Sequence, residues 1–170
     1  DVCSSDLPTD AGGFARLGFR PIDLGEDEAA WDALSNPAVF RSVLRPLMRV
    51  KSLDAGGFPH RWDSAAVHQV SMSLFGILPM GRQTIDVTYT ERPGGVRMII
   101  DQGEPLSGIL AFTTAWDHRM AISASSSGKT LYRDRLSVRA GLLTLPLWLG
   151  LWALWQYRGK RLAALAKRWG

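Results

Sequence analysis

The segment Leu142–Trp155 reads LLTLPLWLGLWALW and is apolar on almost every side. Residues 156–169 continue it, with apolar side chains on one helical stripe. A helix that is apolar all round is buried, either in a protein core or in a membrane. This run is interrupted by Thr144 and Pro146, and its roughly 14 residues are fewer than the roughly 18 to 20 that cross a bilayer. The sequence therefore predicts a long C-terminal helix that the rest of the chain covers.

The residues before this helix have an apolar period of two, which is typical of strands. In residues 66–75, for example, Val70, Met72 and Leu74 share one face, while polar side chains take the other face. Turns that contain glycine separate the strand-like segments, which indicates an antiparallel meander. These segments are 47–53, 66–75, 84–90, 96–101, 109–116, 119–124 and 131–138.

Shorter elements precede this region. Residues 14–22 have the pattern of a first strand, residues 26–34 predict a short helix with an acidic start, and residues 38–44 predict a second helix. Only the C-terminal helix has enough apolar surface to cover a sheet. The predicted fold class is therefore α+β: a curved antiparallel sheet of about six or seven strands wrapped on a long C-terminal helix, with two short helices after the first strand.

The composition indicates one folded domain. The chain has 170 residues, of which 46% are hydrophobic and 21% are charged, unlike a disordered protein. Its single cysteine cannot form an internal disulfide, and no cysteine or histidine cluster has the spacing of a zinc site. The net charge of +4 is too small to mark a nucleic-acid-binding domain. We therefore expect no metal, no cofactor and no nucleic-acid partner.

The first seven residues, DVCSSDL, are what a sequencing-library adapter encodes when it is read in frame. We expect residues 1–12 to be a non-native or disordered segment and residues 13–170 to form the single domain. The native N-terminus and any signal peptide are then undetermined. The predicted location is the cytoplasm, with membrane association as an alternative.

Four segments resemble a known family: WDALSNPAVF at 31–40, LFGILPMGRQTIDV at 74–87, WDH at 116–118 and YRDRLSVRAGLLT at 132–144. In the same order, they resemble stretches of uncharacterised bacterial members of the START-like, polyketide cyclase/dehydrase (SRPBCC) superfamily. The resemblance implies a helix-grip fold with a cavity between the sheet and the last helix. Across the superfamily this cavity holds lipids, sterols, polyketides or other apolar molecules, and some members are enzymes whereas others are carriers.

A curved sheet and a straight helix differ in shape, and side chains only partly fill the gap between them. Plain core packing is the alternative for each aromatic or methionine residue in this region. The predicted ligand-binding residues are, from the sheet, Met72, Val87, Tyr89, Met98, Phe112, Trp116 and Leu136, with His68, Val70 and Ile85 beside them, and, from the helix, Trp148, Leu151, Trp152 and Trp155.

Asp134 interrupts the apolar face of its strand. A carboxylate that faces a core needs a partner, for which His118, Arg82 and Arg158 are the candidates. With Tyr132, and with His68 on another strand, these residues could perform general acid and base catalysis. The alternative is a structural hydrogen-bond cluster that ties the last strands together.

The end of the C-terminal helix is basic, with Arg158, Lys160 and Arg161. This face is either solvated or attracted to an anionic membrane surface. Three functions follow from the sequence: binding or carriage of an apolar small molecule, a cyclase/dehydratase-like enzyme that uses His118 and Asp134, and a membrane-surface interaction module. The ligand and the oligomeric state stay open.

Overall fold

The computed structural model describes residues 15–18, 21–126 and 128–169. The segment 1–12, predicted to be non-native or disordered, lies outside the described residues. In chain order the elements are β1 (Ala15–Gly18), β2 (Ile22–Asp23), α1 (Asp27–Leu34), α2 (Pro37–Leu44), β3 (Met48–Ser52), β4 (His68–Leu74), β5 (Leu78–Ile85), β6 (Val87–Arg92), β7 (Val96–Asp101), the 3-10 helix η1 (Gly108–Phe112), β8 (Ala115–Ala124), β9 (Thr130–Arg139), the 3-10 helix η2 (Gly141–Leu143) and α3 (Thr144–Ala166).

The strands pair in two antiparallel sets. The larger set has the order β1-β9-β8-β7-β6, and β2 also pairs with β9. The smaller set has the order β3-β4-β5, and a bridge between Gln83 and Pro105 joins it to the chain that follows β7. The described residues thus contain nine strands in place of the six or seven predicted.

Two predicted strands have different boundaries in the structure. The predicted strand 84–90 is divided at Asp86 into β5 and β6, because the Asp86 backbone N–H donates to the Asp101 carboxylate, 3.0 Å away. The predicted strand 109–116 begins as η1, after Gly108 turns the chain with a φ of 72°. Short apolar runs fit either a strand or a helix, and the backbone at these two points decides between them.

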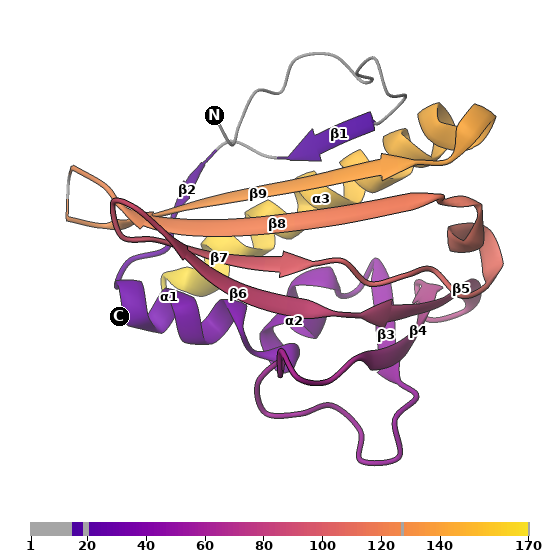
Figure 1. The fold of residues 1–170 in the computed structure, drawn as a ribbon, viewed down its shortest axis with the longest axis horizontal. Helices are drawn as coiled ribbons and strands as arrows, with labels where there is room; N and C mark the ends of the chain where they lie inside the picture. Colours follow the sequence, from indigo (N-terminus) through magenta and orange to yellow (C-terminus); the bar gives the residue numbers. More distant parts are fainter. Residues whose placement is uncertain (1–14, 19–20, 127, 170) are drawn as a thin grey trace.

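The long helix α3 lies across one face of the larger sheet (Figure 1). Pro146 is tolerated near its start because N–H groups in the first helical turn have no intrahelical partner. Near its end, Leu162 belongs to the larger buried core cluster, and further back Leu151 and Trp155 pack in a second cluster of buried residues. The predicted α+β helix-grip arrangement is confirmed. Within the described part of the chain, no helix combines the length and hydropathy that crossing a membrane requires.

The two short helices also follow their sequence signals. Asn36 caps α2 by accepting a hydrogen bond from the backbone N–H of Ala38, and Pro37 occupies the first helical turn. The end of α2 is tied to α3 because the Tyr157 hydroxyl donates to the carbonyl of Arg45 at 2.7 Å. The two predicted helices thus form as expected, and α2 packs against α3.

The helix η1 lies directly on strand β5. A Cβ atom on Gly108 would be only 2.3 Å from the carbonyl oxygen of Met80, and one on Gly81 would be 1.9 Å from the carbonyl oxygen of Ser107. These glycines allow two backbones to touch where any side chain would separate them. The contact fixes η1 over the smaller sheet.

Replacing Gly108 with alanine should destabilise the fold by about 3 kcal/mol or more, because a strained positive φ is added to a clash with the Met80 backbone. Gly95 is a matched control, since its φ is 71° and nothing lies within 4 Å of a Cβ placed there. Gly95→Ala should cost only about 1 to 2 kcal/mol. Urea unfolding of the two variants measures both losses; equal losses would mean that the close approach of η1 to β5 contributes nothing.

Candidate functional site

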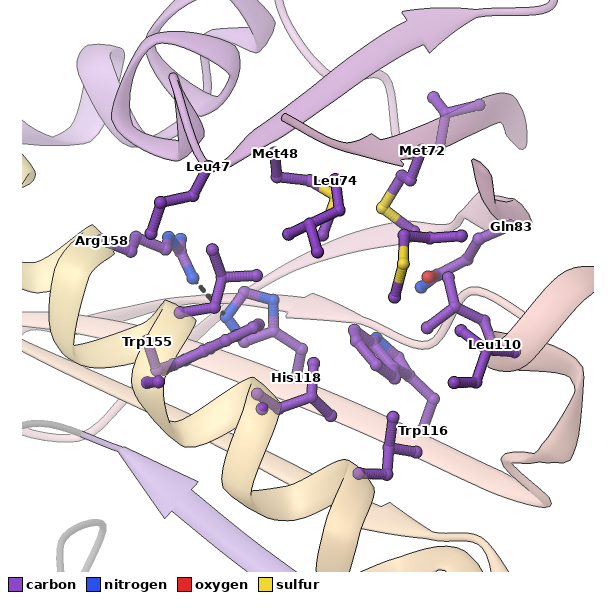
Figure 2. Close-up of a pocket in the computed structure, with 18 of the residues that line it drawn as sticks. Leu47, Met48, Met72, Leu74, Gln83, Leu110, Trp116, His118, Trp155 and Arg158 are labelled. Atoms are coloured by element: carbon purple, nitrogen blue, oxygen red, sulfur yellow. Dashed lines mark hydrogen bonds between the residues drawn. The ribbon is translucent and has the colours of Figure 1, made fainter. Parts of the chain in front are cut away.

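A cavity of about 480 Å³ lies between α3 and the strands of both sheets, with η1 at its side. Figure 2 shows it bounded by α3 on one side and by methionine and leucine side chains of the smaller sheet on the other. Most lining residues are apolar. The lining consists of Phe40, Leu47, Met48, Val70, Met72, Leu74, Phe75, Met80, Gln83, Ile85, Asp101, Ile109, Leu110, Phe112, Trp116, His118, Leu143, Pro146, Leu147, Gly150, Leu151, Ala153, Leu154, Trp155 and Arg158.

The cavity is open at one end. Phe75, Ile109, Phe112 and Leu143 line it and are also exposed, with 42 to 60% of their surface accessible. These residues come from the turn after β4, from η1 and from η2, so three short segments form the rim of the cavity. A molecule can therefore enter without the core unfolding.

Five of the predicted ligand-binding residues line this cavity: Met72, Phe112, Trp116, Leu151 and Trp155. Val70 and Ile85, predicted beside them, line it as well.

The other predicted residues lie elsewhere, which corrects the prediction. Val87, Met98 and Leu136 are fully buried in packed core. Tyr89 packs edge-on against Trp31 and donates its hydroxyl hydrogen to the Trp62 carbonyl.

On α3, Trp148 donates its indole N–H to the Arg16 carbonyl, and the half-exposed Trp152 stacks on it. Neither lines the cavity, although Trp148 packs against the same buried cluster as Leu151 and Trp155. The all-round apolar pattern could not show which tryptophans would line the cavity.

The prediction missed one wall of the cavity, which comes from β3, the β4–β5 hairpin and η1. Its residues include Met48, Leu74, Met80, Gln83 and Leu110. Residues 78–83 were not predicted to form a strand, so Met80 and Gln83 were missed, although period-two counting back from Ile85 places Gln83 on the same face.

Asp134 is fully buried, accepts hydrogen bonds from three side chains and forms an ion pair with a fourth. Oδ1 accepts from the Trp155 indole N–H at 3.0 Å and lies 2.8 Å from Nε2 of His118. Oδ2 accepts from the Tyr132 hydroxyl at 2.7 Å and forms an ion pair with Nη1 of Arg158 at 2.7 Å. The predicted pairing of Asp134 with His118 and Arg158 is confirmed. Arg82, the third candidate, lies elsewhere and contacts Ser107.

The protonation pattern of this cluster follows from its geometry. Burial alone would raise the pKa of Asp134, but the charge of Arg158, followed by His118, holds that pKa well below its usual range. The carboxylate is thus ionised, and Nε2–H of His118 donates to its Oδ1. Nη1 of Arg158 is also 3.1 Å from Nε2 of His118, but a nitrogen that donates to Asp134 has no lone pair left to accept.

Of the four catalytic candidates, only His118 borders the cavity. Asp134 and Tyr132 lie behind it, and burial together with the charge of Asp134 raises the pKa of the Tyr132 hydroxyl well above its usual value. His68 is outside the lining, bonded to Asp54 at 3.0 Å and packed on Trp62. The cluster can therefore reach a ligand only through His118 and the adjoining edge of Arg158.

The basic end of α3 is smaller than predicted. Arg158 is buried against Asp134, so its assignment to an exposed basic face is wrong. Lys160 and Arg161 are exposed as expected. Among the described residues, no three of histidine, cysteine, aspartate or glutamate come together as a metal site requires.

No family model and no curated protein matches the chain. Several solved structures do resemble it. Protein CV1439 from Chromobacterium violaceum has a TM-score of 0.53 at 19% identity, over 91% of this chain and 97% of that one. Ms6760 from Mycobacterium smegmatis has a TM-score of 0.55 at 12% identity, over 95% of each chain. A Staphylococcus epidermidis protein solved by NMR has a TM-score of 0.55 at 11% identity, over 92% and 90%. At such identities the likeness shows the fold alone.

Replacing Arg158 with methionine should cost about 3 to 5 kcal/mol of folding stability, because it leaves the Asp134 carboxylate buried without its cation. The matched control is Arg161→Met on the exposed face of the same helix, which should change stability by less than about 0.5 kcal/mol. Chemical denaturation of the two variants gives the comparison. Similar small losses in both would show that Arg158 is not needed to hold the buried carboxylate.

Proposed function

We propose that this protein binds and carries an apolar small molecule, such as a lipid, a quinone or a polyketide-like compound, in the cavity between the sheet and α3. The observation that carries the proposal is a cavity of about 480 Å³ with almost entirely apolar walls and an open mouth. This volume is in the usual range of small-molecule sites. Well-packed protein cores contain few voids larger than a water molecule, so a hollow of this size calls for an occupant.

The position of the cavity supports the proposal further. It lies between the long helix and the curved sheet, which is where the resemblance to the START-like superfamily implies a ligand site. We propose membership of that superfamily on the same grounds: the sequence segments, the element order and the place of the cavity.

The rim gives such a carrier a surface at which to exchange an apolar ligand. Leu142 and Leu145, at the start of α3, are exposed beside the rim residue Leu143. An apolar rim of this kind can contact a membrane surface at the point where a ligand would enter. The cations Lys160 and Arg161 lie toward the other end of α3, away from this rim. Membrane association is thus proposed through the rim.

A second candidate function is catalysis of the cyclase/dehydratase kind. The observation that favours it is His118, which borders the cavity and is oriented from behind by Asp134. With Nε2 directed to Asp134, Nδ1 has no partner among the described residues, and in the neutral ring it carries the lone pair. A base held by a buried carboxylate is a recurring catalytic arrangement.

His118→Gln separates the two functions, because a glutamine amide can keep the hydrogen bond to Asp134 while removing the basic nitrogen. A carrier should keep its affinity for an apolar fluorophore, whereas an enzyme should lose about 100-fold or more in turnover of a β-hydroxy carbonyl substrate. His68→Gln, outside the cavity, is the control. Wild-type protein that turns over no such substrate would rule out the second candidate for that substrate class.

Gly150→Phe should block the cavity. Gly150 lines it, and nothing lies within 4 Å of a Cβ placed there, so the new ring enters open space without a clash. We expect affinity for N-phenyl-1-naphthylamine to fall about tenfold or more, the equivalent of losing about 1.4 kcal/mol of contact. Leu149→Phe, on the neighbouring exposed residue outside the lining, should leave affinity within about twofold.

Fluorescence titration measures both affinities, and native mass spectrometry of the purified wild type identifies any ligand that it retains. Failure of the wild type to bind the fluorophore, together with an empty mass spectrum, would contradict the carrier. Unchanged binding by Gly150→Phe would place the ligand elsewhere.

A further inference from the structure

Two uncharged side chains in the cavity wall have a buried polar atom without a hydrogen-bond partner. Gln83 is only 3% exposed, and its Oε1 is buried with no partner. The indole Nε1 of Trp116 is likewise buried with no partner. Both residues line the cavity, one from β5 and the other from β8. Figure 2 shows the Gln83 amide and the Trp116 ring directed into the cavity, on the side away from Arg158.

An unpartnered polar atom in a buried wall lowers stability, so it calls for an explanation. A leucine in place of Gln83 would match the neighbouring Met72 and Leu110, which line the same part of the cavity. Local choices that oppose stability are typical of functional positions. A molecule bound in the cavity beside Gln83 and Trp116 could supply a hydrogen-bond partner for both.

The chemistry of the two groups defines that partner. An indole N–H can only donate, so it needs an oxygen or nitrogen with a free lone pair. A primary ammonium has none and does not fit. The glutamine amide offers both a donor and an acceptor, and it can rotate to present either one. A hydroxyl group satisfies both residues, and a carbonyl oxygen can accept from both.

The charges in the wall favour a neutral group. Asp101 also lines the cavity, and its Oδ1 accepts from the backbone N–H groups of Asp86 and Gly103. Burial raises the pKa of Asp101, so this part of the wall disfavours negative charge, and a ligand carboxylate would have to enter the same buried space. The one cation in the wall, Arg158, is already paired with Asp134 and lies on the other side of the cavity.

We infer that the cavity selects an apolar molecule with an uncharged hydroxyl or carbonyl oxygen, which binds between Gln83 and Trp116. This inference rests on the proposed carrier function and narrows its ligand class. The walls hold the apolar body, and the two polar groups fix which end of the ligand lies beside them.

The test uses compounds of one chain length that compete with N-phenyl-1-naphthylamine: octan-1-ol, octan-2-one, 1-chlorooctane, octanoate and octylamine. The wild type should bind the alcohol and the ketone about tenfold more tightly than the chloride, which has similar shape but forms no strong hydrogen bond. Gln83→Leu and Trp116→Phe should each reduce this preference severalfold. Their affinity for 1-chlorooctane should stay within about threefold of wild type, since the apolar walls are retained.

Met72→Leu is the matched control, because it changes an apolar wall residue of similar volume. It should shift the affinities for the alcohol and the chloride equally, so that their ratio stays as in wild type. Gln83→Leu should also raise the melting temperature of the ligand-free protein, since it removes an unpartnered buried amide.

The outcomes separate the inference from the carrier function. Equal binding of alcohol, ketone and chloride would overturn the inference and leave the carrier standing. Preference for octanoate or octylamine would overturn the neutral ligand class. If neither the fluorophore nor any octyl compound binds, the proposed function fails and the inference fails with it.

Discussion

The buried ion pair between Asp134 and Arg158 fixes α3 to the sheet. Asp134 lies in the middle of β9, which pairs with β1 on one side and β8 on the other, and Arg158 lies two-thirds of the way along α3. A buried carboxylate is costly unless every lone pair is used, and here four donors surround it. Because two of these donors, Trp155 and Arg158, come from α3, the helix can satisfy Asp134 in only one position and rotation. This single contact therefore determines which stripe of α3 faces the cavity.

The space between α3 and the sheet is filled with side chains on one side of that contact and hollow on the other. Toward the end of α3, Leu162 packs with Tyr132 and Ile99 in a filled core. Toward its start, Leu147 and Gly150 face the cavity, and the opposite wall comes from the smaller sheet and η1. A straight helix cannot follow a curved sheet along its whole length, so close packing at one end leaves space at the other. The close approach of η1 to β5 at Gly81 and Gly108 then forms the side of this space.

The sequence was sufficient to predict the parts that depend on pattern. The apolar C-terminal segment, the alternation in residues 66–75 and the need of Asp134 for a partner each point to a structure that the molecule has. The misplaced parts depend on curvature and rotation, which a pattern does not record. Trp148 and Trp155 are seven residues apart and share one side of the helix, yet Trp155 lines the cavity whereas Trp148 bonds to the Arg16 carbonyl. Arg158 likewise looks like its exposed neighbours Lys160 and Arg161 until the rotation of α3 is known.

Asp134 and Gln83 are both buried polar residues, but the fold supplies partners to only one of them. Asp134 shows that this fold can supply a full set of donors to a buried group when packing requires it. Gln83 is also buried, but its Oε1 has no partner and its side chain borders the cavity. An unpaired polar atom in a buried wall lowers stability. A molecule in the cavity could supply the missing partner, so the cavity and its unpartnered amide support the same proposal.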